Sequence, residues 1–201
     1  KTAGQTAVAG DVTVSGGILK WLVADQIANT STITLNSGTV NMNNFDETVT
    51  AFVNNGGVFS TGTGHLTGTG ASITWAGGTN TVNDGGIVED GHIVITGGTN
   101  TVEGGTTGGV LQLNGGGTGL EMTGSTLSLN SSDSVAGKLL LKGNVSSGAS
   151  ATTSNISNAG TGTNPGTIDL DGGTRTFTIA NGAAAIDMAI SARIINGALT
   201  K

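Results

Sequence analysis

One phrase of six residues occurs twice in the chain, and its two copies lie twenty residues apart. Residues 77–82 and 97–102 both read Gly-Gly-Thr-Asn-Thr-Val. Each copy follows a short apolar run, at residues 73–75 and 93–95. A strand, a glycine turn and a second strand therefore repeat with a fixed period. Short strands repeating in this way are typical of a β-solenoid, in which each rung (one full turn of the coil) stacks on the one before.

The same frame of strand, glycine turn and strand can be laid over five places, which begin at Ile33, Ile73, Ile93, Leu111 and Ile168. The side chains expected to form an inward core stack are Ile73, Trp75, Ile93, Ile95, Leu111, Leu113, Ile168 and Leu170. Stacked rungs pair each strand in parallel with its equivalent, and the rest of the coil supplies the crossover that parallel pairing requires. Because such crossovers are almost always right-handed, the sequence predicts an all-β fold, a right-handed parallel β-helix (β-solenoid) with about 20 residues per rung.

The glycine content supports this fold rather than disorder. The chain has 201 residues, of which 37 are glycine, yet 35% are apolar and recur in short alternating runs. Disordered chains lack such runs, because they do not bury enough apolar surface to fold. We expect one solenoid module over residues 1–201. Residues 24–29 are expected to be a loop, and residues 146–166, poor in large apolar side chains, an extended loop.

Charge and cysteine content exclude several classes of function. Seven Lys and Arg against thirteen Asp and Glu give a net charge of -6, with no basic cluster. This disfavours nucleic acid and anionic membrane surfaces as partners. No apolar run is long enough to insert this segment into a membrane. The absence of cysteine rules out disulfides, thiolate metal sites and cysteine catalysis.

Two stretches of the chain resemble a known family, the autotransporter-associated β-strand repeat. The first comprises residues 13–19, 24–27, 33–40 and 45–49, and the second comprises residues 166–170, 174–179 and 197–201. The family occurs in very large secreted and surface proteins. The resemblance implies an extracellular or cell-surface β-helix with a structural, adhesive or transport-associated role, and it offers no catalytic residues to transfer.

The two ends of the chain suggest a longer repeat. The final Leu199-Thr200-Lys201 reads as though it continues into Lys1 and Thr2. We expect the module to be one unit of a tandem array, with Lys1 equivalent to Lys201. Uncapped solenoid ends expose open strand edges. The expected partners are therefore neighbouring copies of the same module, stacked end to end into a rod or fibre.

Acidic side chains are the candidates for chemistry, because many parallel β-helices act on polysaccharides with clustered carboxylates. Glu89 and Asp90 form one pair, and Asp169 and Asp171 are expected on an outer face near Arg175. The favoured interpretation is a solvated surface with one salt bridge.

A second acidic group is expected along the axis of the rod. Asn83, Glu103 and Glu121 occupy one position of the frame and are expected to stack on successive rungs. Stacked carboxylates invite a cation such as Ca²⁺, but the nonapeptide calcium signature is absent. We therefore expect solvated acids, and no catalytic residue, metal or other cofactor.

The histidines and two asparagines complete the candidates. His65 and His92 are the only histidines, and His92 is expected to be an exposed spacer. Asn80 and Asn100 occupy equivalent positions of the repeated phrase. Two interpretations stay open for them: a structural ladder of stacked amides along the rod, or the ordinary preference of asparagine for turns.

Three functions follow from these features. The first is a structural or adhesive module without enzymatic activity. The second is a carbohydrate-binding or carbohydrate-active β-helix of the lyase or hydrolase type, disfavoured by a content of only two Trp, four Phe and no Tyr. The third is ice binding, which requires a flat threonine grid. Thr74 is expected to stack with Val94 and Gln112, so no long threonine row is expected on that face.

Overall fold

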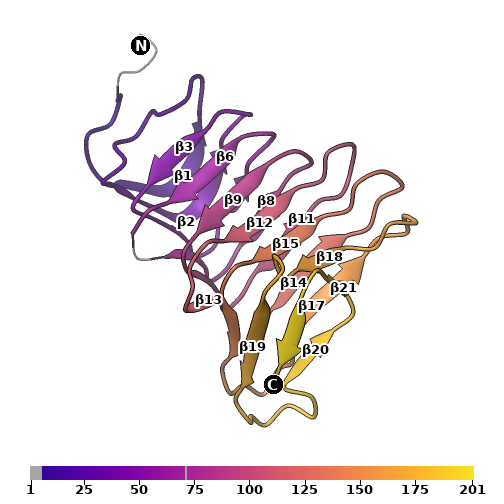
Figure 1. Ribbon diagram of the computed structural model, residues 1–201. Helices are drawn as coiled ribbons and strands as arrows, with labels where there is room; N and C mark the ends of the chain where they lie inside the picture. Colours follow the sequence, from indigo (N-terminus) through magenta and orange to yellow (C-terminus); the bar gives the residue numbers. More distant parts are fainter. Residues whose placement is uncertain (1–5, 71) are drawn as a thin grey trace.

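The computed structural model describes residues 6–70 and 72–201, and this part of the chain is all-β with no helix. Its strands pair in parallel and stack as a β-solenoid of about 8 turns with roughly 23 residues per turn. Figure 1 shows the rungs following one another from β1 to the C-terminal strand. The expected parallel β-solenoid is confirmed.

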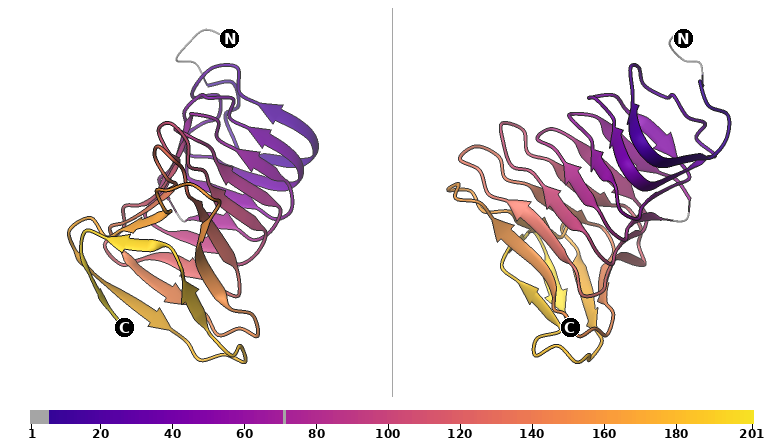
Figure 2. Two further views of the ribbon diagram at one scale, coloured as in Figure 1. Left: turned by 90° about the vertical axis from the view of Figure 1, so that its right-hand side faces the viewer. Right: turned by 180° about the vertical axis from the view of Figure 1, so that it is seen from behind.

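Each rung has three faces, and each face is a ladder of parallel strands (Figures 1 and 2). Face one contains β4 (Ala51–Asn54), β7 (Ile73–Trp75), β10 (Ile93–Ile95), β13 (Thr118–Met122), β16 (Asn144–Ser147), β19 (Thr174–Ile179) and β22 (Ala198–Thr200). Face two contains β5 (Val58–Ser60), β8 (Thr79–Val82), β11 (Thr99–Val102), β14 (Thr126–Asn130), β17 (Ser154–Ala159) and β20 (Met188–Ile190). Face three contains β3 (Glu47–Val49), β6 (His65–Gly68), β9 (Ile87–Asp90), β12 (Val110–Leu113), β15 (Lys138–Leu141), β18 (Thr167–Asp169) and β21 (Arg193–Ile195).

The first two strands each cross faces one and two. β1 (Val12–Lys20) pairs along its length with β2 (Thr32–Asn41), whose first half pairs with β4 and whose second half pairs with β5. Both strands bend where glycines adopt positive φ, at Gly16, Gly17 and Gly38. The left-handed region is accessible to glycine without steric cost, so the chain turns the corner while its ladder continues.

The length of a rung is not constant. Ile73 pairs with Ile93, twenty residues later, as the repeated phrase predicts. The next partner on face one, Leu120, comes twenty-seven residues after Ile93, and Val145 pairs with Phe177 thirty-two residues later. Rung length therefore varies after β10, and 20 residues describes only the first part of the coil.

This variation in rung length corrects the alignment of the frame. Leu111 and Ile168 were expected to stack on Ile73 and Ile93, but they lie on face three, in a row with Val88. Face one continues instead through Leu120. The alternation of inward and outward side chains is the same on all three faces, so it identifies a strand without identifying its face.

The corner between faces one and two keeps its length from β4 to β14, and it lengthens to seven residues between β16 and β17 and to nine between β19 and β20. β5, β8, β11 and β14 each begin four residues after β4, β7, β10 and β13 end. In the corner between faces two and three, β9 begins five residues after β8 ends, whereas β12 and β15 begin eight residues after β11 and β14. Up to β14, the extra residues of the longer rungs lie outside the corner between faces one and two. These two faces therefore stay in register over this part of the coil.

The expected extended loop over 146–166 is wrong in its middle. β17 (Ser154–Ala159) crosses this segment and pairs with β14, and its Ile156 is fully buried. Small residues occupy most of the other positions, so the apolar alternation that marks a strand is reduced to a single side chain. Residues 24–29 contain no helix, as expected.

The core consists of inward side chains from every rung. All eight residues of the predicted core stack are buried, each with a relative exposure of 0%. They form two stacks rather than one, with Ile73, Trp75, Ile93 and Ile95 on face one and Leu111, Leu113 and Ile168 on face three, where Leu170 follows β18. Burying a large apolar side chain contributes about 1.5–3 kcal/mol, so these stacks supply the main stabilisation of a chain without helices.

Candidate functional site

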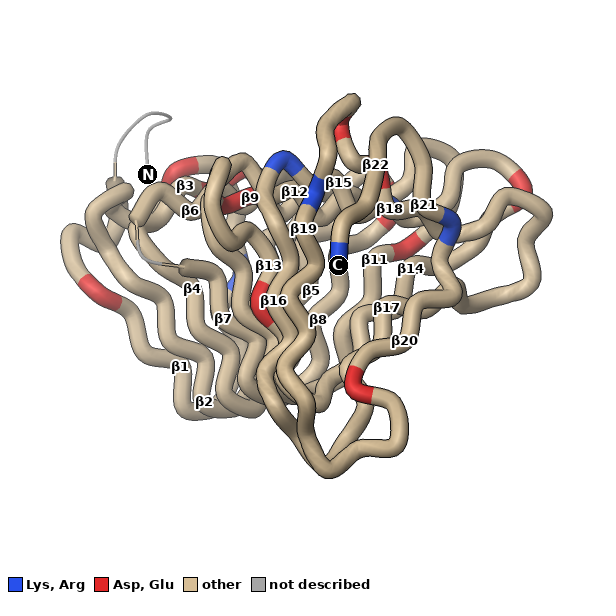
Figure 3. Tube along the Cα trace, turned by 60° about the horizontal axis from the view of Figure 1, so that its bottom comes forward, with Lys and Arg blue, Asp and Glu red and all other residues tan. Residues whose placement is uncertain are grey.

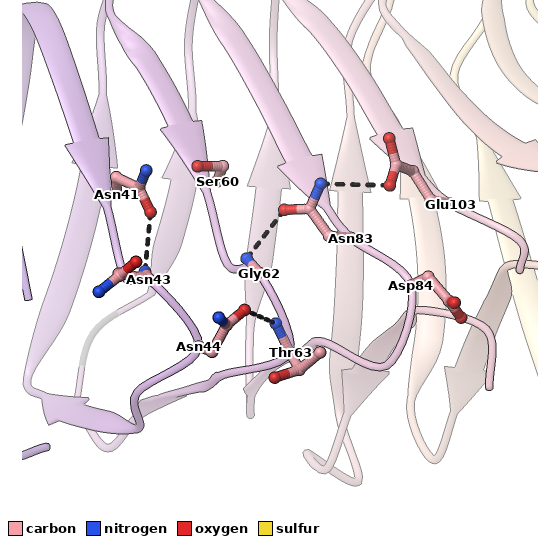
Figure 4. Close-up of a pocket in the computed structure, with 9 residues that line it drawn as sticks. All are labelled: Asn41, Asn43, Asn44, Ser60, Gly62, Thr63, Asn83, Asp84 and Glu103. Carbon is pink, nitrogen blue, oxygen red and sulfur yellow. Dashed lines mark hydrogen bonds between the residues drawn. The ribbon is translucent and has the colours of Figure 1, made fainter. Parts of the chain in front are cut away.

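A polar hollow runs along the corner between faces two and three, across four successive rungs. Its volume is about 420 Å³, and Figure 4 shows its lining side chains projecting from the ends of the face-two strands. The lining residues are Asn41, Asn43, Asn44, Ser60, Gly62, Thr63, Asn83, Asp84 and Glu103. None of these side chains is aromatic, and all of the side-chain polar atoms are oxygens or amide nitrogens.

Most of the polar groups in the hollow bind the corner of a neighbouring rung. Asn44 Oδ1 accepts from Thr63 N at 2.9 Å, and Asn83 Oδ1 accepts from Gly62 N at 2.9 Å. Asn83 Nδ2 donates to Glu103 Oε2 at 3.1 Å on the next rung (Figure 4). These bonds satisfy the backbone N–H groups that a corner leaves outside the strand ladder. The hollow thus links successive corners along the axis.

Asp84 makes the strongest of these links. Its carboxylate accepts from three consecutive backbone N–H groups of the next rung, Thr106 at 2.9 Å, Thr107 at 2.9 Å and Gly108 at 2.6 Å. Backbone donation, from Thr107 first, lowers the pKa of Asp84 below the ordinary aspartate value. The ionised carboxylate therefore acts as a clamp on residues 106–108.

The predicted stack of Asn83, Glu103 and Glu121 forms only in part. Asn83 and Glu103 lie side by side on successive rungs, as expected. Glu121 was expected on the same row but lies on face one, where it follows Val94 in register and its Oε2 lies 3.5 Å from His92 Nε2. The error follows from the longer rung between β10 and β13. His92 is half-buried rather than a free spacer.

The other predicted acids have separate environments. Asp169 Oδ2 lies 3.8 Å from Lys138 Nζ, so the partner of this ion pair is Lys138 and not Arg175. Arg175 instead donates to two backbone carbonyls, Leu141 O and Leu170 O, at 2.9 Å each. Asp171 is exposed at positive φ in the corner after β18. These groups hold the chain and do not converge on a shared point.

His65 and Glu89 form the largest polar cluster on face three. Glu89 Oε2 accepts from Gln112 Nε2 at 2.8 Å and Asn114 Nδ2 at 3.3 Å, and it lies 3.4 Å from His65 Nε2. The cluster joins three successive rungs. In the part of the chain that the structure describes, no three His, Asp or Glu side chains come together in a way that could hold a metal ion.

Asn80 and Asn100 lie inside the coil and not on its surface, with relative exposures of 0% and 1%. Asn54 Nδ2 donates to Asn80 Oδ1 at 2.8 Å, and Asn80 Nδ2 donates to Asn100 Oδ1 at 2.9 Å. This series of hydrogen bonds ends at Asn100, whose Nδ2 donates to the carbonyl of Thr126 at 3.0 Å. Three buried amides therefore form a continuous ladder along the axis.

The same amides also close the glycine corners. Asn80 Nδ2 donates to Gly77 O at 3.2 Å, and Asn100 Nδ2 donates to Gly97 O at 3.0 Å. Both interpretations of this pair, ladder and corner closure, describe what the side chains do. The asparagine stands three residues after the first glycine of the repeated phrase because that spacing brings its amide onto the corner carbonyl.

Two buried carboxyls were not identified from the sequence as inward residues. Asp90 is 3% exposed, and its Oδ2 has no hydrogen-bond partner in the structure, while Oδ1 accepts from His92 N at 3.0 Å. Glu47 is 1% exposed and accepts through Oε2 from Trp21 Nε1, Gln26 N and Ile27 N. Desolvation on burial raises the pKa of both carboxyls.

Room for Asp90 is left by a glycine. A Cβ on Gly68 would lie 1.9 Å from Asp90 Oδ2, so the carboxyl occupies the space that a side chain on the preceding rung would fill. The sequence feature that indicates a buried Asp90 is the alternation over residues 87–90, in which Asp90 points inward with Val88. The composition does not show that Asp90 is buried, whereas the register of the face-three strands does.

Charges are sparse over the surface, and Figure 3 shows acidic and basic residues scattered along the coil. Within residues 6–70 and 72–201, no helix is long and apolar enough to cross a membrane. The sequence matches no protein-family model, and neither the curated proteins nor the solved structures yield a significant match.

Proposed function

We propose that the chain is a structural module of an extracellular or cell-surface rod, in which solenoid units stack end to end. The observation that carries this proposal is that the coil consists throughout of parallel rungs, each covering the core of the rung before, so that a further unit can continue the same ladders. Ile194 continues the face-three row of Leu139 and Ile168, which are fully buried, yet Ile194 is 40% exposed. A further rung would cover it as each rung covers the one before.

The last strands support the same proposal. β20, β21 and β22 each have one paired neighbour, and among the described residues no helix or loop covers their free edges. Leu199 in β22 is 42% exposed. Unpaired N–H and C=O groups beside exposed apolar side chains are a template for a further strand. At the opposite end of the coil, β2 is the only ladder neighbour of β1 among the residues that the structure describes (Figure 1).

The role of such a module is mechanical. Its polar clusters and its amide ladder join successive rungs, which suits a spacer of fixed length rather than a catalyst. The resemblance to autotransporter-associated repeats supports the extracellular or cell-surface location. The expected tandem array is part of this proposal, although Lys1, its expected equivalent of Lys201, lies outside the described residues.

Sedimentation velocity over a wide concentration range tests end-to-end stacking. We expect the 201-residue chain to associate as its concentration rises, and Ile194→Lys to abolish association because it places a charge on the uncovered core. Leu199→Lys provides a second end variant. The matched control is Val58→Lys, since Val58 is 46% exposed on a lateral face in β5, which is paired with a strand on each side. A wild-type chain that stays monomeric throughout, or a control that dissociates as the end variants do, would contradict the proposal.

A further inference from the structure

Face two presents two parallel rows of outward side chains, and these rows consist mainly of hydroxyls. The first row contains Thr39, Val58, Thr79, Thr99, Thr126 and Asn155. The second row contains Asn41, Ser60, Thr81, Thr101, Ser128 and Ser157. We call these twelve residues the hydroxyl array. The threonine grid that was sought on the face of Thr74 thus lies on the neighbouring face.

The array differs from the other two faces in charge. No residue of the array is charged from β2 to β17, and Lys20 of β1 marks its end beyond Asn41. Face one places Glu121 in its outward row, and face three places Glu89 and Lys138 in its own. The preference of threonine for strands applies to all three faces. It therefore does not account for the absence of charge from β2 to β17, beyond which Lys20 continues the second row in β1.

The central hydroxyls have no partner inside the protein. Among the described residues, the side chains of Thr79, Thr81, Thr99 and Thr101 make no hydrogen bond, although polar side chains elsewhere on the coil link rung to rung. Thr79 and Thr99 are exposed. Water or a partner outside the chain satisfies these groups, and their regular spacing presents the same arrangement at every central rung.

The array is held in register from beneath. Between Thr79 and Thr81, and between Thr99 and Thr101, lie the inward residues Asn80 and Asn100 of the buried amide ladder. The four-residue corner before β5, β8, β11 and β14 keeps these strands aligned even where the next rung is twenty-seven residues long. The hydroxyl positions are therefore fixed by the core and by backbone pairing.

The spacing of the array is close to that of tetrahedral water. Neighbouring rungs are separated by about 4.8 Å, and alternate residues of a strand by about 6.7 Å. With an O···O hydrogen bond of about 2.8 Å, two water oxygens that share a tetrahedral neighbour lie about 4.6 Å apart. The repeat of such a lattice along its stacking axis, eight-thirds of the bond, is about 7.5 Å, roughly a tenth longer than the distance between alternate residues of a strand.

We propose that face two is an ice-binding surface, on which water ordered over the hydroxyl array joins the lattice of an ice crystal. The methyl groups of threonine, together with Val58, limit the competing contacts of liquid water, and the absence of charge avoids strongly hydrated groups that do not fit a lattice. The proposal does not depend on end-to-end stacking, because each module carries its own array.

Freezing hysteresis and partition into a slowly growing ice hemisphere test the proposal on the 201-residue chain. We expect the wild-type chain to enter the ice, and Thr99→Tyr to lose both activities because a large ring in the array lifts the surface away from the lattice. Thr99→Lys provides a second variant that adds charge with less bulk. The matched control is Thr178→Tyr, which changes an exposed threonine of β19 on face one and should retain full activity.

Three results would overturn the proposal. The wild-type chain could be excluded from ice, or the face-one control could lose activity together with the face-two variants. The chain could instead be retained on crystalline cellulose or chitin and not on ice, which would assign the array to a polysaccharide surface. Circular dichroism of each variant establishes that the solenoid is intact before either activity is compared.

Discussion

At the scale of single residues, the amide ladder offers the clearest test of what holds neighbouring rungs together. Asn80→Leu keeps the size of the side chain but leaves Asn54 Nδ2 without its bond to Asn80 and Asn100 Oδ1 without a donor. Each unsatisfied buried group costs about 1–3 kcal/mol. We expect the variant to lose about 2–5 kcal/mol of unfolding free energy, measured by urea denaturation.

An exposed amide pair in the same region is the matched control. Asn55 Nδ2 donates to Asn36 Oδ1 at 2.9 Å, but both groups face water. Solvent can replace this bond, so Asn55→Leu should change stability by less than about 0.5 kcal/mol. Equal losses in Asn80→Leu and Asn55→Leu would show that the buried ladder has no special role.

The buried Asp90 predicts an unusual dependence of stability on pH. Burial raises its folded pKa above the ordinary value of 3.8, so the folded chain binds this proton more readily than the unfolded chain. The resulting stabilisation is complete below the unfolded pKa and is lost as the pH rises through the folded pKa. Asp90→Asn removes the titration while Oδ1 can still accept from His92 N.

We therefore expect Asp90→Asn to gain stability relative to the wild-type chain as the pH rises from 3.5 to 7. Urea denaturation at several pH values measures this difference. A constant difference between the two proteins across the range would mean that Asp90 titrates equally in the folded and unfolded chains.

For Asp84 we expect the opposite dependence of stability on pH. Its folded pKa is lowered by the backbone N–H groups of residues 106–108, so its stabilisation is present above the unfolded value of 3.8 and is lost as the pH falls through the folded pKa. Asp84→Asn should destabilise the chain at neutral pH and speed amide hydrogen exchange at residues 106–108. Glu103→Gln, in the same hollow but bonded only to Asn83, should leave this exchange unchanged.

At the scale of elements, the corner between faces one and two depends on glycine for two separate reasons. Gly78 has φ +67°, and a Cβ there would lie 2.0 Å from the carbonyl oxygen of Gly57 on the preceding rung. Gly172, in the corner between faces three and one, has a similar φ of +72° but has no atom within 4 Å of the Cβ position. The pair separates backbone strain from close approach between rungs.

We expect Gly172→Ala to cost about 1 kcal/mol, which is the penalty of a left-handed alanine. Gly78→Ala should cost about 3 kcal/mol or more, because one corner must also move away from the next. Thermal unfolding followed by circular dichroism measures both variants. Similar losses would show that the corners are loosely stacked.

The strands and corners also show which parts of the fold can be predicted from the sequence. The repeated phrase predicted the solenoid because each of its positions has one physical role: Gly78 turns the corner, Asn80 bonds along the axis, Thr81 faces water and Val82 enters the core. Leu111 was assigned to the wrong face because rung length varies at the corners, where no periodicity constrains it.

The site was less predictable than the fold for a related reason. The hydroxyl array and the hollow join residues from four to six rungs, and their alignment depends on corner lengths that the sequence does not specify. Asp90 and Glu47 carried no signal in composition, because buried acids in this chain are defined only by the register of face three.

At the scale of the whole molecule, stability is expected to be close to a sum over neighbouring rungs. Each rung pairs only with the rung before and the rung after it, and the faces run the length of the coil (Figure 2). Such proteins gain stability as rungs are added, and their uncapped ends are the weakest points. The proposed association of the ends would both protect them and extend the rod.

X-ray fibre diffraction from concentrated, aligned protein tests the central claim, that modules stack end to end into a continuous solenoid, most directly. With strands perpendicular to the rod, we expect a meridional reflection at about 4.8 Å along the filament axis. About 8 turns per module add a longer axial repeat of about 38 Å at this spacing. Filaments with the 4.8 Å spacing across the axis, or a solution that forms no filaments at any concentration, would contradict it.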